Sequence, residues 1–301
     1  MQNGVYKSTA SGIAKLTSGE TGWYYVRNGV YRPGASGIAK KADGSSDTWF
    51  YVSGGRYNTE YTGLARKADC SSETLFYVEN GIYKKSSISS YEYQSGIYKI
   101  TNGVASLQSG YGDLWVQDYG MTYVKSDELI DLFCCLKIKN TEKNYPCEVM
   151  LKLAGYASDN AVINSGNESI SMIAPGDTLY CTMHIAYNGD EEPYYIGGTL
   201  YPNFFEPEDW SEEVEEASAF SLVNVSRHKN GTCSEYTGGI KCSGSYDRPV
   251  FVNVIYYKDG KIVGGHHELF QAYVSKPAKF SMTAENEPDH DSYKLFVTQR
   301  R

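Results

Sequence analysis

The sequence predicts an all-β protein in which an N-terminal β-hairpin repeat array is followed by two β-sandwiches. The chain has 301 residues, among them 28 tyrosines and 30 glycines, a combination that favours strands joined by tight turns. A unit of 25 to 26 residues recurs through about residue 99, and longer alternating segments replace it afterwards. This change of period predicts at least two kinds of domain.

The repeat consists of a turn block, a Gly-aliphatic-Ala-basic block and an aromatic block. Copies of the turn block are Asn3–Tyr6, Asn28–Tyr31, Gly54–Tyr57 and Asn80–Tyr83. Copies of the second block are Ser11–Lys15, Ser36–Lys40, Thr62–Arg66 and, after the insertion Lys84–Tyr93, Ser95–Lys99. Copies of the aromatic block are Trp23–Val26, Trp49–Val52 and Leu75–Val78.

Each unit has the signature of a β-hairpin. Trp23–Val26 reads as a strand, Asn28 and Gly29 as a tight turn, and Val30–Tyr31 as the return strand. A lone two-stranded hairpin cannot bury its aromatic face, so successive hairpins are expected to stack as a solenoid over residues 1–108. The altered fourth unit, with Leu75 in place of tryptophan, is typical of a terminal cap.

These blocks resemble the aromatic and glycine-rich hairpin repeats of Gram-positive cell-wall-binding proteins, the choline-binding-like repeats among them. The resemblance covers about a third of the chain and implies carbohydrate binding to a cell-wall or host glycan, through ring stacking or cation–π contact. The aromatic residues that it implicates are Trp23, Tyr25, Tyr31, Trp49, Tyr51 and Tyr57. The alternative hypothesis is that these rings are the core of the solenoid.

The rest of the chain predicts half-buried strands with apolar side chains on one face. In the first set these are Leu132–Asn140, Cys147–Leu153 and Leu179–Ile185. In the second set they are Gly239–Cys242, Pro249–Tyr257, Ile262–Gly265, Lys279–Met282 and Tyr293–Val297. The stretch Ser106–Asp113 before the first set is rich in turn residues and is expected to mark the domain boundary.

Two prolines of the first set recur in the second. Pro146 corresponds to Pro249 and Pro175 to Pro277, which predicts two copies of one sandwich over residues 109–204 and 218–301. The pattern resembles the FxLYD-type immunoglobulin-like domains of bacterial envelope proteins, which implies spacer or interaction modules. Residues 205–217 between the copies are strongly acidic and are expected to form a solvated linker.

Composition argues against several functions. The formal net charge of −8 and the lack of a basic stripe argue against nucleic-acid binding, and no apolar run approaches the roughly 20 residues needed for membrane insertion. No cofactor-binding loop is recognisable, and the five histidines form no catalytic motif. His266 and His267 are adjacent, but neighbours on a strand point to opposite faces, so no metal site is expected. The chain is therefore expected not to be an enzyme.

The seven cysteines match no zinc or redox motif. Cys147 with Cys181, or Cys233 with Cys242, could form disulfides in an exported protein, and the sequence does not choose between partners. The repeat begins in mid-unit at Gln2, so we expect a fragment of a longer exported protein, extracellular or at the cell surface, with no signal peptide of its own.

Three functions follow from these patterns. The first is a non-catalytic surface binding or adhesion module whose array binds glycan, with the sandwiches as spacers. The second is a structural stalk or adhesin fragment that binds a host or bacterial surface protein. The third and least favoured is an enzyme with a site between domains.

Overall fold

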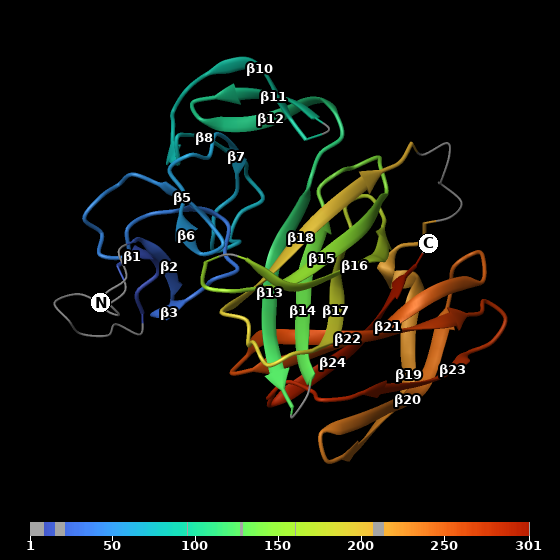
Figure 1. Ribbon diagram of the computed structural model, residues 1–301. Coiled ribbons are helices and arrows are strands. Elements are labelled where there is room, and N and C mark those ends of the chain that lie inside the picture. Colours follow the sequence, from blue (N-terminus) through green and yellow to red (C-terminus); the bar gives the residue numbers. More distant parts are fainter. Residues whose placement is uncertain are drawn as a thin grey trace. The chain divides into compact units, whose positions relative to one another are not determined.

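The computed structural model describes residues 9–15, 22–94, 96–126, 129–159, 161–206 and 214–300, and it is all-β (Figure 1). Within these residues the secondary structure consists of antiparallel strands and one short 3-10 helix, η1 (Ala217–Ala219). The chain divides into two compact units, residues 1–112 and 113–301. Each unit is described by itself below.

The described residues of the first unit form twelve short strands in one sheet, built from hairpins. The strands are β1 (Gly12–Ala14), β2 (Tyr24–Arg27), β3 (Val30–Tyr31), β4 (Gly37–Ala39), β5 (Phe50–Ser53), β6 (Arg56–Tyr57), β7 (Gly63–Ala65), β8 (Phe76–Glu79), β9 (Ile82–Tyr83), β10 (Ile88–Tyr93), β11 (Gly96–Thr101) and β12 (Val104–Gly110). The predicted hairpins are β2–β3, β5–β6 and β8–β9, and all three are antiparallel pairs. The first predicted turn block, Asn3–Tyr6, lies outside the described residues.

Tight turns with positive φ connect the two strands of each hairpin. Asn28 and Gly29 have φ of 53° and 73°, and Asn80 and Gly81 have 51° and 71°. Positive φ at both central residues is what a type I′ hairpin turn requires. Asn102–Gly103 between β11 and β12 repeats the geometry, so the array has a further turn of this kind. It follows Asn80–Gly81 at a shorter interval than the 25- to 26-residue period, and the repeat pattern therefore did not predict it.

Hydrogen bonds between consecutive units repeat with the sequence period. The Tyr25 amide donates to the Gly55 carbonyl, the Tyr51 amide to Gly81 and the Tyr77 amide to Gly103, each at 2.8 Å. The amides of Ile13 and Ile38 likewise donate to the carbonyls of Lys40 and Arg66, both at 2.8 Å. Each hairpin is therefore attached to the next by the same backbone contacts, so the array propagates with one geometry.

The last part of the array is a three-stranded meander, β10–β11–β12, which adds Tyr98 and Ile100 to a core with Leu64, Leu75 and Tyr77. Residues 106–110, expected as turns, extend β12 instead. Their pairing with β11 in an antiparallel ladder explains the difference, because these exposed residues form a strand without apolar alternation in their sequence.

In the part of the second unit that the structure describes, the strands form four three-stranded antiparallel sheets. In the first half the strands are β13 (Leu114–Lys125), β14 (Leu129–Asn140), β15 (Cys147–Tyr156), β16 (Val162–Ile173), β17 (Thr178–Asn188) and β18 (Tyr195–Phe204). In the second half they are β19 (Phe220–Asn230), β20 (Cys233–Cys242), β21 (Arg248–Lys258), β22 (Lys261–Ala272), β23 (Ala278–Ala284) and β24 (Ser292–Gln299).

The two halves have the same topology. Their strand orders are β13-β14-β17 with β16-β15-β18, and β19-β20-β23 with β22-β21-β24. In both halves, therefore, the first, second and fifth strands form one sheet and the fourth, third and sixth form the other. Pro146 and Pro249 stand at the third strand of their halves, and Pro175 and Pro277 precede the fifth, so the predicted correspondence matches the topology.

The halves pack face to face. We name β13-β14-β17 the first inner sheet, β15-β16-β18 the first outer sheet, β21-β22-β24 the second inner sheet and β19-β20-β23 the second outer sheet. The inner sheets meet through an apolar cluster of Cys135, Ile255 and Ile262, with Tyr180, Tyr257 and Phe296 beside it. The order of the layers is thus outer, inner, inner, outer.

This arrangement corrects one expectation from the sequence. Leu132–Asn140 was expected to be half-buried, yet β14 is buried on both faces, with Leu132, Phe133, Cys134 and Cys135 all at most 1% exposed. The second layer of contact comes from residues more than 100 positions away in the chain.

Glycines allow the inner sheets to approach closely. A Cβ at Gly120 would lie 2.1 Å from the Ile262 carbonyl oxygen, and one at Gly265 would lie 2.4 Å from the Thr182 side chain. Close packing of two backbones excludes any side chain at these points.

The outer sheets end the stack because their solvent faces are polar. On β15, Glu148 and Lys152 alternate with the buried Val149 and Leu151. On β20, Glu235 is exposed and its neighbour Tyr236 is buried. Charged side chains on an outward face disfavour the addition of another sheet.

The acidic linker is described only at its two ends, because residues 207–213 lie outside the described ranges. Glu215 is docked rather than simply solvated. Its amide donates to Gln299 Oε1 at 2.7 Å, and its carboxylate accepts the Ser245 amide at 2.7 Å.

Candidate functional site

The six aromatic residues implicated by the sequence are distributed between the core and the surface of the array. Tyr25 is 2% exposed and belongs to a core with Ile13, Ala35 and Val52. Burial, followed by the nearby Asp69 charge, raises the pKa of Tyr25 to about 12. Its ring therefore serves the core.

The two tryptophans are partly buried and flanked by lysines. The Lys15 and Lys41 ammonium groups lie 5.6 and 4.9 Å from the Trp23 ring centroid. Those of Lys40 and Lys67 lie 5.7 and 5.5 Å from the centroid of Trp49. In each case one lysine is the last residue of the Gly-aliphatic-Ala-basic block before the tryptophan. The other lysine directly follows the next copy of that block, so the arrangement recurs with the repeat. Cation–π attraction of this kind holds an ammonium group near the ring.

The tyrosines of the return strands pair edge to face with the strand before them. Tyr31 lies 5.4 Å from Tyr24 and Tyr57 lies 5.4 Å from Phe50, both near 90°. Phe76 and Tyr83 repeat the pair at 5.7 Å. The remaining candidate, Tyr51, stacks at 3.7 Å on Tyr61, a residue that sequence reasoning did not single out. Burial raises the pKa of Tyr51.

The structure thus keeps the six rings in separate local contacts. Trp23 packs on the core that contains Tyr25, and Trp49 and Tyr51 pack on the next one with Ile38 and Val78. What recurs along the array is a half-buried tryptophan between two lysines, and the lysines of the Gly block were the signal that sequence reasoning did not use.

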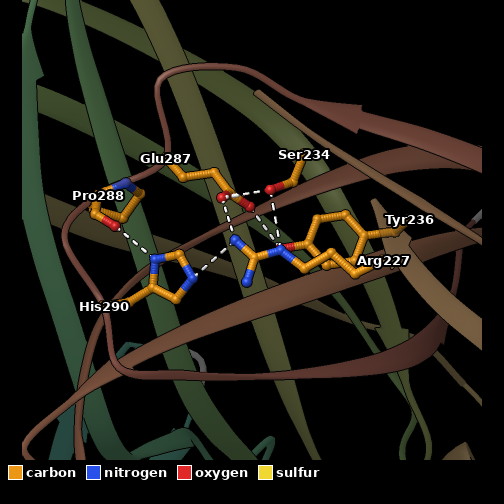
Figure 2. Close-up of polar contacts among 6 residues, drawn as sticks. All are labelled: Arg227, Ser234, Tyr236, Glu287, Pro288 and His290. Carbon is orange, nitrogen blue, oxygen red and sulfur yellow. Dashed lines mark hydrogen bonds and ion pairs between the residues drawn. The ribbon is translucent and has the colours of Figure 1, made fainter. Parts of the chain in front are cut away.

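A second group of polar side chains surrounds Glu287 in the loop between β23 and β24 (Figure 2). Its carboxylate accepts Tyr236 OH at 2.5 Å, Ser234 Oγ at 2.7 Å and Arg227 Nη2 at 2.5 Å. The Glu287 side chain is 3% exposed and that of Arg227 is 17% exposed. His290 Nδ1–H donates to the Pro288 carbonyl at 2.7 Å, which leaves Nε2 to accept from Arg227 at 3.1 Å.

The electrostatics of this cluster favour ionised Glu287. Burial by itself raises the pKa of the carboxyl. The hydrogen bonds from Tyr236 and Ser234 and the charge of Arg227 lower the pKa by more than burial raises it, so the net shift is downward. All of these donors converge on one carboxylate. The arrangement fixes the β23–β24 loop to β19 and β20, which is a structural task.

Histidines and polar side chains gather where the inner sheets meet. His184 Nε2 lies 2.7 Å from Asp131 Oδ1, and Asn286 donates to the other carboxylate oxygen at 3.0 Å. The Thr182 hydroxyl donates to Asn253 Oδ1 at 2.8 Å and lies 3.1 Å from His267 Nδ1. Within the described ranges no group of three or more His, Cys, Asp or Glu side chains could hold a metal ion.

Cys147, Cys181, Cys233 and Cys242 are free thiols. Cys233 and Cys242 begin and end the same strand, β20, which places them about 30 Å apart at 3.3 Å per residue. Such a pair cannot form a disulfide, so that alternative is wrong. Cys147 and Cys181 are both fully buried, and burial raises the pKa of the Cys147 thiol to about 12.

No protein-family model matches the chain, and no curated protein matches it. No helix in the described part of the chain has the length and apolar character to cross a membrane.

Proposed function

We propose that this chain is a non-catalytic binding or adhesion module of a bacterial cell surface, in which the repeat array binds a cell-wall or host glycan. In this proposal the array is a short hairpin solenoid, and the two halves of the second unit are immunoglobulin-like sandwiches that space or present it. The observation that carries the proposal is the Trp–Lys arrangement, which recurs at Trp23 and Trp49 in consecutive units.

A repeating surface suits a repeating ligand. Equivalent groups on successive units can engage successive sugars of one polymer, and such multivalency raises avidity by about 10²–10⁴ without stronger single contacts. An aromatic ring offers its face to a sugar ring, and the adjacent ammonium groups donate hydrogen bonds to hydroxyl or acidic substituents.

The lysines argue for a glycan rather than choline. A quaternary amine would have to displace the ammonium groups that already lie over both tryptophans. Residues 1–112 contain 12 basic and 8 acidic residues, a net charge of +4, whereas residues 113–301 contain 16 and 28, a net charge of −12. Within the glycans, the charge of the array therefore favours an acidic polymer.

The array itself suggests the test. Leu75 stands at the tryptophan position of the third aromatic block and packs there at 8% exposure, so leucine fits this position of the fold. We expect Trp23→Leu and Trp49→Leu each to weaken binding to solubilised cell-wall or mucin glycans about tenfold, equivalent to ~1.4 kcal/mol. Leu75→Trp should strengthen it. Intrinsic fluorescence titration and glycan pull-down measure both effects.

Trp115→Phe is the matched control, because Trp115 lies on β13 of the second unit. It should leave glycan affinity unchanged. The proposal fails if the folded chain binds none of these glycans above background, or if the Trp23→Leu, Trp49→Leu double variant binds as tightly as the parent.

The second candidate is a structural stalk or adhesin fragment that binds a host or bacterial surface protein. The burial of Tyr25 and the lysine cover of the tryptophans support it, since both give the rings a packing role. Loss of thermal stability in the double variant, with no glycan binding by the parent, would favour this function.

A further inference from the structure

Three imidazole rings lie close together where the two halves of the second unit meet. His184 is on β17 of the first inner sheet, and His266 and His267 are on β22 of the second. The His184 and His266 ring centroids are 5.4 Å apart, and those of His266 and His267 are 6.5 Å apart. Phe133 stacks on His184 at 4.5 Å, so the cluster has an apolar neighbour as well.

Negative charge around this cluster is scarce. Asp131, whose side chain is 4% exposed, pairs with His184 and also accepts from Asn286. The charges that act on His266 are those of His184 and His267, both of which oppose its protonation. Other titratable groups on the packed elements include Asp118 on β13, Cys135 on β14, Tyr256 on β21, Glu268 on β22, and Glu287 and His290 on the β23–β24 loop.

The remaining carboxylates among these groups accept hydrogen bonds from other groups. Glu268 accepts the Thr283 amide at 3.2 Å, and Glu287 is held by Arg227, Ser234 and Tyr236. Asp118 accepts the Tyr119 amide at 2.9 Å. Protonation of more than one imidazole would therefore leave positive charges at short range with one nearby counter-ion.

His266 is the most constrained ring of the three. Its Nε2 is buried with no hydrogen-bond partner among the described residues. Burial first, and then the charges of His184 and His267, lower its pKa to about 3, against a smaller upward effect of a backbone hydrogen bond with Thr283. An uncharged imidazole is tolerated in such a place, but an imidazolium requires solvent or an acceptor.

We propose that the interface between the two inner sheets is acid-sensitive, and that protonation of His266, in the histidine cluster of His184, His266 and His267, opens it while both halves stay folded. The direction follows from proton linkage. A histidine in water titrates near 6.5, whereas His266 in the closed interface titrates near 3, so the open form binds the extra proton between these values. The closed form is fully favoured above pH 6.5 and loses its advantage as the pH falls.

Two adjacent cysteines report the opening. Cys135 lies in the apolar cluster between the inner sheets, whereas Cys134 points to the first outer sheet, with its sulfur 3.7 Å from the Cβ position of Gly198. Both are 0% exposed. Separation of the inner sheets would expose Cys135 and leave Cys134 buried.

The experiment is pulse labelling of the full chain with 4,4′-dithiodipyridine, which reacts with thiols in mild acid, followed by fragmentation that resolves the two cysteines. Rates are normalised to the unfolded chain at each pH. For His266 alone, linkage allows the opening equilibrium to rise up to tenfold per pH unit below about 6. We expect the Cys135 rate to rise at least tenfold between pH 7 and pH 5, with Cys134 unlabelled.

Variants assign the effect to the cluster. His266→Gln should hold Cys135 labelling at pH 5 near its pH 7 rate, and His266→Phe provides a second substitution if the glutamine variant does not fold. His228→Gln is the matched control, because His228 is exposed on β19, and it should behave as the parent.

Three results would overturn the proposal. Protection of Cys135 at pH 5 would mean that the interface stays closed. Equal labelling of Cys134 and Cys135 would mean global unfolding rather than opening. Labelling of a folded His266 variant at the parent rate would mean that the histidine cluster does not control the interface.

Discussion

At the scale of single residues, glycine determines where the repeat can turn. Gly81 and Gly44 have nearly the same φ, 71° and 70°, but different surroundings. A Cβ at Gly81 would lie 2.2 Å from the Asn58 carbonyl oxygen, whereas one at Gly44 would meet nothing within 4 Å. The turn within a hairpin that packs on the preceding unit therefore needs glycine for space as well as for conformation.

This contrast gives a prediction for the array. Gly44→Ala should cost about 1 kcal/mol of stability, the strain of a side chain at positive φ. Gly81→Ala should cost about 2–4 kcal/mol, because displacement of a neighbouring backbone adds to that strain. Urea unfolding of the two variants measures the difference. Equal losses would show that the approach of Asn58 imposes no restriction.

At the scale of elements, buried polar contacts join strands that hydrophobic periodicity does not connect. Glu287 ties the β23–β24 loop to β19 and β20, and its neighbour Asn286 reaches Asp131 of the first half. One short loop thus contacts both halves. Asn286 and Glu287 make these contacts, and nothing in the sequence indicated that two consecutive polar residues would join the halves.

The Glu287 cluster predicts an asymmetric effect of two conservative substitutions. Tyr236→Phe keeps the ring but removes a donor to the buried carboxylate, which should cost about 1.5–3 kcal/mol, typical of a hydrogen bond to a charged group. Tyr246→Phe, at an exposed tyrosine, should change stability by less than about 0.5 kcal/mol. Chemical denaturation at pH 7 distinguishes them, and similar values for both would contradict the assigned hydrogen bond.

At the scale of the whole molecule, packing divides the chain into two units rather than three. The two halves of the second unit share a buried interface that contains apolar residues and the polar chain Ser171–Thr298–Asn253–Thr182. Breaking this interface would leave buried polar groups without partners, which opposes separate unfolding at neutral pH.

Calorimetry near pH 7.5 should therefore resolve two transitions, one for residues 1–112 and one for residues 113–301. Gly120→Val should lower the transition of the second unit alone, because a side chain there meets the Ile262 backbone. Gly81→Ala should lower the transition of the array alone. Three resolved transitions would show that the inner interface does not couple the halves. A shift of the array by Gly120→Val would show that the two units do not unfold independently.

Much of the fold follows from local pattern. The 25- to 26-residue period, the Asn–Gly turns and the alternating segments predicted an all-β chain, and the hairpins β2–β3, β5–β6 and β8–β9 lie where the blocks placed them. The prolines indicated two equivalent halves, and the strand orders agree. Local pattern suffices because φ preferences and side-chain alternation act over a few residues.

The candidate sites depended on tertiary structure. The same aromatic block supplies a buried ring at Tyr25 and a lysine-flanked ring at Trp23, and the sequence marks both as equally suitable for a ligand. Strand alternation separated His266 from His267, but it gave no indication that His184, about 80 residues earlier, would complete a cluster with them.

By itself, therefore, the sequence determined the all-β class, the repeat and its turns, and the correspondence of the two halves. Tertiary structure alone decided that β14 is buried on both faces, that Cys233 and Cys242 lie at opposite ends of one strand, and that the histidines meet between the inner sheets. The physical reason is range. Hydrophobic alternation reports which face of a strand is apolar, whereas the identity of the layer packed on that face depends on contacts between distant parts of the chain.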